Sequence, residues 1–202
     1  MRLTELTRLA DMTVMFPAAL VILAWLLLSR SKTASCMWGI SLLFVYGLVG
    51  ASKVLFKGWG VGLQTLNISV ISGQAMNATL ILTVGLSLLA RQYHAQLRWP
   101  AAALGQSIGW WFGIVCVTKN AHPLSEAIAG CMLGAIAACA FLYRIERIEL
   151  RRLHWAAIAC GLLLIGATTT ITQFPVEKWL DQVAISISGE DKAIKHAGWR
   201  QN

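Results

Sequence analysis

The stretch TASCMWGISLLFVYGLVGAS, residues 33–52, carries no charged side chain from end to end. An α-helix of roughly 20 mostly apolar residues is long enough to cross a bilayer core of about 30 Å. Uncharged runs of similar length recur on both sides of this stretch. They predict membrane-spanning helices near residues 12–29, 34–52, 73–90, 100–118, 123–143 and 155–174.

The composition agrees with lipid as the surrounding medium. Hydrophobic residues make up 57% of the chain and charged residues only 13%, whereas a soluble domain is usually about 25% charged. Only helices and closed barrels satisfy the backbone in lipid, and the apolar runs lack the alternation of barrel strands. We therefore predict an all-α fold: a polytopic integral membrane protein with six transmembrane helices in one bundle, forming one domain over residues 1–202.

The two ends of the chain need separate interpretation. An uncleaved signal sequence is an alternative for residues 12–29, but Arg30-Ser31-Lys32 follows instead of a small-residue cleavage site, which favours a span. Within residues 175–202, apolar residues at helical spacing predict a short amphipathic helix on the membrane surface, followed by a polar tail. They are Val176, Trp179, Leu180, Val183 and Ala184.

The net charge of +8 gives an expected orientation. In a membrane protein, basic residues lie at anionic headgroups, so we predict the bilayer and no nucleic acid as a partner. Basic residues are most frequent in the loops after the first, third and fifth spans, which the positive-inside rule places in the cytoplasm. They are Arg30, Lys32, Arg91, Arg98, Arg144, Arg147, Arg151 and Arg152. Both termini and the other two loops are then expected on the periplasmic side of a bacterial inner membrane.

Ionisable residues near lipid are costly and therefore candidates for function. His122 and Glu126 lie four residues apart at the start of the fifth span, which places them on one helix face. A carboxylate there fixes the imidazole tautomer and raises its basicity, as a nucleophilic histidine requires. The alternative is a pair at headgroup level in which the helix dipole merely favours Glu126.

Two further groups belong to the same side of the membrane. Lys53 and Lys57 end the second span, where lysines either extend to the interface or clamp a phosphate. Ser72-Gly73-Gln74 precedes the third span, and the free N–H groups of a helix N-terminus bind anions, although serine is also an ordinary N-cap. Together with the histidine and its carboxylate, these groups predict one phosphate site.

In this order and placement, the residues resemble the type 2 phosphatidic acid phosphatase family, whose members dephosphorylate lipid phosphates and diphosphates. The family pattern is a Lys, six residues and Arg-Pro, then Ser-Gly-His opening a helix, then Ser-Arg, five residues, His, three residues and Asp. Lys53, Ser72-Gly73-Gln74 and the stretch HPLSEAIAG at residues 122–130 look like its parts. The resemblance covers residues 53–130 and, by topology, roughly the whole chain.

The resemblance implies a mechanism without a metal or cofactor. His122 is the expected nucleophile, forming a phosphohistidine that water hydrolyses, and Glu126 is its orienting carboxylate. Lys53 is the expected phosphate clamp, with Lys57, Ser72 and Gly73 contributing to anion binding. The implied partner is a phosphorylated or diphosphorylated lipid, and the sequence makes no prediction of oligomeric state.

Three departures from the pattern weaken this expectation. Gln74 replaces the histidine that protonates the leaving group and activates water, and losing a general acid or base typically costs about 10²–10⁴ in rate. Gly60-Val61 and Val115-Cys116 stand where Arg-Pro and Ser-Arg are expected. Lys119, one turn before the histidine, offers a positive charge at a different spacing. We therefore expect a weakened phosphatase.

Two alternatives stay open from the sequence. One is a catalytically silent relative that binds a phosphorylated lipid or supports a partner membrane enzyme. The other is an unrelated transporter or scaffold, for which inverted-repeat helices would be a sign.

Overall fold

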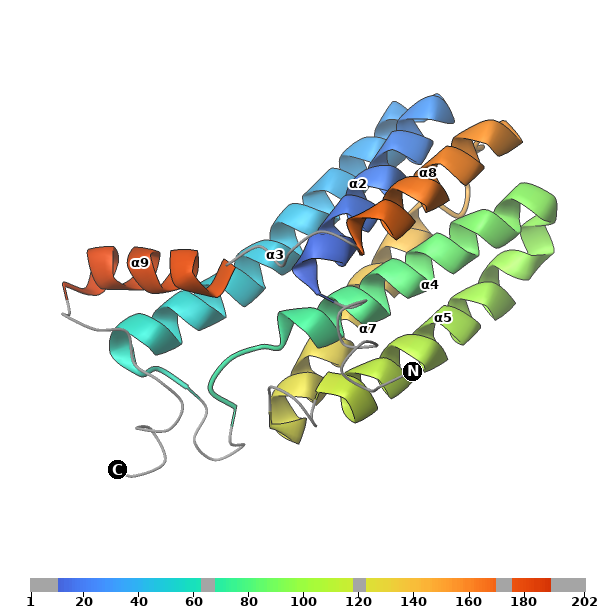
Figure 1. Ribbon diagram of the computed structural model, residues 1–202. Coiled ribbons are helices and arrows are strands. Elements are labelled where there is room, and N and C mark those ends of the chain that lie inside the picture. Colours follow the sequence, from blue (N-terminus) through green and yellow to red (C-terminus); the bar gives the residue numbers. More distant parts are fainter. Residues whose placement is uncertain (1–10, 63–67, 118–122, 170–175, 190–202) are drawn as a thin grey trace.

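The computed structural model describes residues 11–62, 68–117, 123–169 and 176–189. All regular elements within these ranges are helices (Figure 1), which confirms the all-α prediction for this part of the chain. They are α2 (Met12–Leu28), α3 (Lys32–Trp59), α4 (Gly73–Tyr93), η2 (Ala95–Leu97), α5 (Arg98–Phe112), η3 (Gly113–Val117), α7 (Leu124–Arg144), α8 (Trp155–Thr168) and α9 (Val176–Ser188).

Among the described helices, α3, α4 and α7 are long and apolar enough to cross a membrane, judged by length and composition. The shorter helices α2 and α8 are also apolar, and α5 runs directly into η3, a single π-helical turn. Helix α3 continues past the predicted end of its span at residue 52 as far as Trp59, where Gly60 caps it with a φ of 66°. The extension is physically reasonable because lysine ends an apolar run but is a good helix former.

The helix α4 lies at the centre of the bundle and packs against α2, α5 and α7. Its neighbours approach at glycines. A Cβ atom added to Gly105 of α5 would lie 2.5 Å from the Leu82 carbonyl oxygen, and one added to Gly134 of α7 would lie 2.5 Å from that of Met76. The helix backbones are therefore in direct contact, the form of packing that small residues allow between helices in lipid.

Two buried tryptophans connect the outer helices. The Trp38 Nε1 group of α3 donates a hydrogen bond to the Ala19 carbonyl oxygen of α2 at 2.9 Å. The Trp25 Nε1 group of α2 donates to the Ala157 carbonyl oxygen of α8 at 3.1 Å. An indole N–H group in apolar surroundings needs such a partner, so these contacts fix α2 between α3 and α8.

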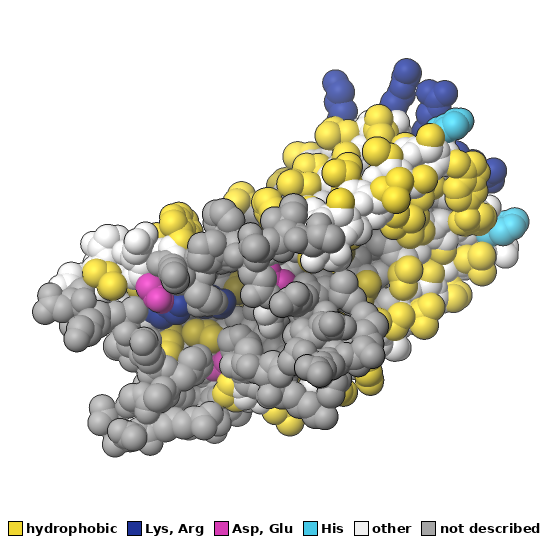
Figure 2. Space-filling model, in the orientation of Figure 1, with side chains coloured by type: hydrophobic (Ala, Val, Ile, Leu, Met, Phe, Trp, Pro, Cys, Tyr) yellow, Lys and Arg dark blue, Asp and Glu magenta, His cyan; other side chains and the backbone are white. Residues whose placement is uncertain are grey.

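At one end of the bundle, the segment that follows α7 contacts the segment that follows α2 and the last turn of α4. The Arg151 amide donates to the Ser29 carbonyl oxygen at 3.4 Å, and the Leu153 amide donates to the Gln92 Oε1 atom at 2.9 Å. Figure 2 shows Lys and Arg side chains gathering at this end, which we call the basic end. Its exposed cations are Arg30, Lys32, Arg144, Arg147, Arg151 and Arg152. The three basic loops thus share one end, while the side of the membrane that it faces stays a prediction.

The predicted C-terminal helix is present as α9, beside the C-terminal part of α3 (Figure 1). Leu180 and Ala184 are buried, whereas Trp179 is exposed. These residues were predicted to face the membrane together, but in the structure some of them contact the protein and another is exposed. An ion pair between the Lys57 Nζ and Asp181 Oδ1 atoms, 2.6 Å apart, joins α9 to α3.

Candidate functional site

The N-terminus of α4 forms the first part of the candidate site. Ser72 is fully buried and is the N-cap of the helix, because its Oγ atom accepts a hydrogen bond from the Ala75 amide at 3.4 Å. The side chain therefore has the ordinary capping role that the sequence offered as an alternative. Gly73 and Gln74 follow in the first turn and are partly buried, and the Gln74 side chain forms no hydrogen bond within the described residues.

Glu126 connects the segment before α4 to the first turn of α7. Its side chain is 0% exposed, and its Oε1 atom accepts hydrogen bonds from the Ser69 amide at 3.1 Å and the Val70 amide at 3.2 Å. The Ser69 hydroxyl donates to the same oxygen. The Glu126 carbonyl oxygen also accepts from the Ser72 amide at 3.2 Å. Glu126 therefore fixes the chain that leads into the N-terminus of α4.

The same segment is held from the other side by α3. The Ser52 Oγ atom accepts from the Ile71 amide at 3.2 Å and donates to the Val49 carbonyl oxygen at 2.8 Å. Lys53, the next residue along α3, is partly buried. The structure thus brings the backbone of Lys53, the N-terminus of α4 and Glu126 to one end of the bundle, opposite the basic end.

Lys57, the second candidate clamp, contacts Asp181 through the ion pair described above. Its side chain is 14% exposed and that of Asp181 is 43% exposed. Asp181 was not predicted as a partner of Lys57, because it lies far along the chain on a helix that the sequence pattern assigns only to the membrane surface. Lys57 therefore has a structural contact in addition to any part in anion binding.

The other two predicted residues, Lys119 and His122, lie outside the described residues. The pairing of His122 with Glu126 and its distance from Lys53 therefore stay predictions. The flanking structure is defined: η3 ends at Val117 and Pro123 is the N-cap of α7. Single π-turns inside helices occur frequently at functional sites.

Two buried polar groups inside apolar runs were not among the residues predicted from the sequence. The side chains of Tyr46 of α3 and Asn77 of α4 interact with each other, but the Tyr46 hydroxyl and the Asn77 Oδ1 atom have no hydrogen bond of good geometry within the described part of the chain. Asn77 is 2% exposed and lies one turn beyond Gln74. An unpaired polar group costs free energy in apolar surroundings, so a group of this kind needs an explanation. An asparagine inside an apolar run is the sequence signal that could have found it.

Anion binding is the chemistry that these residues can support. A helix N-terminus offers N–H groups and a positive dipole end, and a lysine lies on the neighbouring helix. In the described ranges, no three His, Cys, Asp or Glu side chains gather in a way that could hold a metal ion.

The fold is that of a helical protein in which three of the described helices are long and apolar enough to cross a membrane. No family model matches the chain, and no solved structure is detectably similar. A protein of Klebsiella pneumoniae described as an uncharacterized 22.5 kDa protein in a cps region is 30% identical over 188 residues, which cover 90% of each chain. The chain belongs to the family of this Klebsiella protein.

Proposed function

We propose that this chain is a membrane-embedded lipid-phosphate or lipid-diphosphate phosphatase-like protein, weakened in catalysis. The observation that carries the proposal is the arrangement of α3, α4 and α7. Lys53, the Ser72-capped N-terminus and Glu126 come from three helices and share one end, in the order that the resemblance to the type 2 phosphatidic acid phosphatases implies. In this proposal the chain crosses the inner membrane six times and the site faces the periplasm.

Each residue has a distinct role in the proposed reaction. The His122 imidazole attacks phosphorus as the P–O bond to the lipid alcohol or lipid monophosphate breaks, and water then hydrolyses the phosphohistidine to inorganic phosphate and free histidine. Lys53 and the N–H groups at Gly73 stabilise the negative charge of the transferring phosphoryl group. Glu126 orients the histidine and, through Ser69, positions the α4 N-terminus.

The glutamine at position 74 gives an expectation about substrate class. A glutamine amide donates a hydrogen bond to a phosphate oxygen but delivers no proton at neutral pH. An alkoxide leaving group needs protonation as it departs, whereas a phosphate monoester released from a diphosphate departs without it. The protein is therefore expected to retain more activity on a lipid diphosphate, such as a polyprenyl diphosphate, than on phosphatidic acid.

A second candidate function is that of a catalytically silent relative that binds a phosphorylated lipid or supports a partner membrane enzyme. The ion pair of Lys57 with Asp181 favours it, because one of the two candidate clamp lysines already contacts a carboxylate. Gln74 favours it as well, since binding needs a hydrogen-bond donor but no proton donor.

Phosphate release from a panel of lipid monophosphates and diphosphates, measured with purified protein in detergent, separates the two functions. The phosphatase proposal expects slow turnover, an acid-labile phosphate trapped on the protein, and loss of both in His122→Ala. The double variant Gln74→His with Cys116→Arg restores two of the missing groups and should increase turnover. If the folded wild type and the double variant both leave every lipid intact, the phosphatase proposal is wrong and the binding function replaces it.

A further inference from the structure

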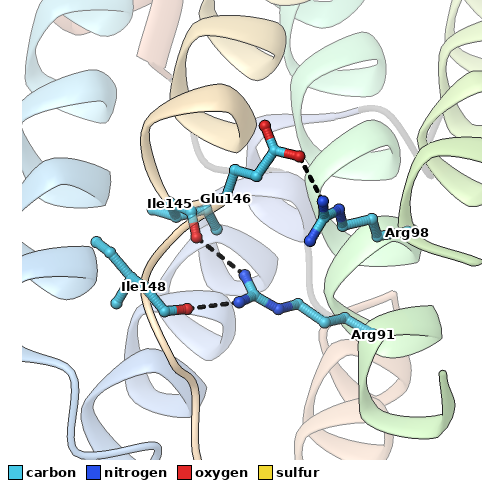
Figure 3. A network of polar contacts seen from close by, with 5 residues as sticks. All are labelled: Arg91, Arg98, Ile145, Glu146 and Ile148. Atoms are coloured by element: carbon cyan, nitrogen blue, oxygen red, sulfur yellow. Dashed lines mark hydrogen bonds and ion pairs between the residues drawn. The ribbon is translucent and has the colours of Figure 1, made fainter. Parts of the chain in front are cut away.

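The basic end contains a network of polar contacts that joins the end of α4 and the start of α5 to the segment that follows α7 (Figure 3). The Arg91 NH1 group donates to the Ile145 carbonyl oxygen at 3.0 Å, and its NH2 group donates to that of Ile148. Arg98, the first residue of α5, forms an ion pair with Glu146. The two arginines therefore fasten the segment that follows α7 to α4 and α5.

The charges in this network do not balance. Glu146 is the single carboxylate in it, and it contacts Arg98, while Arg91 contacts neutral carbonyl oxygens. Both arginines are only partly exposed. Because Arg91 has no carboxylate partner in this network, the network has the charge to accept one further anion.

A small cavity beside the network is lined by residues that carry hydrogen-bond donors without acceptors. Its lining includes Ser87, Arg91, Arg98, Trp99 and Leu142. The Arg98 Nε atom is buried and has no hydrogen-bond partner in the described part of the chain. The Ser87 side chain is buried and its hydroxyl forms no hydrogen bond to any described residue. An occupant rich in acceptor oxygens would satisfy both donors.

We propose that this cavity binds the phosphate group of an anionic phospholipid. The cavity has room for one water-sized group, so one phosphate oxygen enters it and accepts from the Arg98 Nε–H and Ser87 hydroxyl groups, while the rest of the headgroup stays at its mouth. Arg91 and Arg98 supply the positive charge. Trp99, which is exposed, offers apolar contact to the glycerol and acyl region. Basic pockets between membrane helices are a known form of headgroup site.

This lipid site is separate from the proposed phosphatase site. Ser72 and Arg91 stand at opposite ends of α4, about 28 Å apart at 1.5 Å per residue. The exposed cations of the basic end surround the cavity's end of the bundle and raise the local concentration of anionic lipid. The lipid site therefore does not depend on the proposed phosphatase activity.

Lipid retention by the purified full chain, measured by native mass spectrometry after equal additions of phosphatidylglycerol and phosphatidylcholine, tests the proposal. One phosphatidylglycerol per chain should bind at least tenfold more tightly than phosphatidylcholine. Arg98→Lys keeps the positive charge but removes the Nε–H donor, and Ser87→Ala removes the hydroxyl. Each variant should weaken phosphatidylglycerol binding by about tenfold, the effect of losing one hydrogen bond to a charged group.

Arg147→Gln is the matched control, because it removes an exposed charge from the basic end without changing the cavity. It should alter binding by no more than about twofold, as surface substitutions usually do. Equal binding of the two lipids, or an equal loss in Arg147→Gln and Arg98→Lys, would overturn the site. Displacement of the lipid by inorganic phosphate at equal concentration would overturn the assignment to lipid. If Arg98→Lys melts without lipid at a lower temperature than the wild type, Ser87→Ala decides the outcome.

Discussion

Replacing Glu126 by alanine tests whether this carboxylate holds the segment that leads into α4. The Glu126 Oε1 atom accepts from the amides of Ser69 and Val70, and both donors are buried. Glu126→Ala leaves the two N–H groups without a partner, while the Ser69 hydroxyl can rotate toward another acceptor. A buried donor without a partner costs about 1–3 kcal/mol, so the expected loss of stability is about 2–6 kcal/mol.

Thermal unfolding in detergent and amide hydrogen exchange provide the measurement. At about 2–4 °C per kcal/mol for a chain of this size, the midpoint should fall by at least about 4 °C. The amides of Ser69 and Val70 should exchange faster in Glu126→Ala, while those at the centre of α4 keep their protection. Glu149→Ala is the matched control: Glu149 is exposed at the opposite end of the bundle and should change stability by no more than about 0.5 kcal/mol.

The variant Glu126→Gln separates the structural role from a catalytic one. A glutamine oxygen can still accept both hydrogen bonds, so most of the stability and the amide protection should return. Because glutamine is neutral, Glu126→Gln should not restore any effect that the negative charge of Glu126 has on the basicity of His122. An unfolding midpoint in Glu126→Ala no lower than in Glu149→Ala, with unchanged exchange at Ser69, would refute the reasoning.

Three further predictions concern packing, topology and substrate. Gly134→Ala should lower the free energy of unfolding by about 1–3 kcal/mol by overpacking α7 against α4. Gly47→Ala is the control, because an added Cβ there meets nothing within 4 Å, and it should leave the unfolding midpoint unchanged or raised. Equal effects of the two substitutions would contradict the packing argument. When the protein, with its native cysteines replaced, is expressed in intact cells, an impermeant thiol reagent should label Val61→Cys and not Arg147→Cys. The reverse pattern would overturn the predicted orientation. Gln74→His should raise turnover of a lipid monophosphate by up to about 10²–10⁴ and that of a diphosphate less, and equal gains would contradict the leaving-group argument.

The positions of the helices follow closely from the sequence. The apolar runs predicted at 73–90 and 123–143 correspond to α4 and α7, which begin at Gly73 and Leu124. This agreement has a physical cause: a long uncharged run in lipid must satisfy its backbone within itself, and the helix does so. The end of α3 was less predictable, because a charged residue ends an apolar run without ending a helix.

The contacts of the candidate site were not predictable in the same way. Helical spacing relates Glu126 to residues three or four positions away, but the described partners of its carboxylate are Ser69 and Val70 in a distant segment. Lys57 likewise contacts Asp181, on a helix more than a hundred residues later. Such contacts depend on how helices assemble, which the periodicity of one helix does not contain.

The glycine contacts of α4 limit how the helix bundle can adapt to bilayers of different thickness. The 21 residues of α4 rise about 31 Å, close to the hydrocarbon thickness of an average bilayer. A helix free to slide along its neighbours could adjust to a thinner or thicker bilayer. Helix α4 has no such freedom, because movement along its axis would drive its carbonyl groups into the backbones at Gly105 and Gly134. Hydrophobic mismatch must therefore be absorbed by tilting the whole bundle or by deforming the lipid, at a cost of fractions of a kcal/mol per Å.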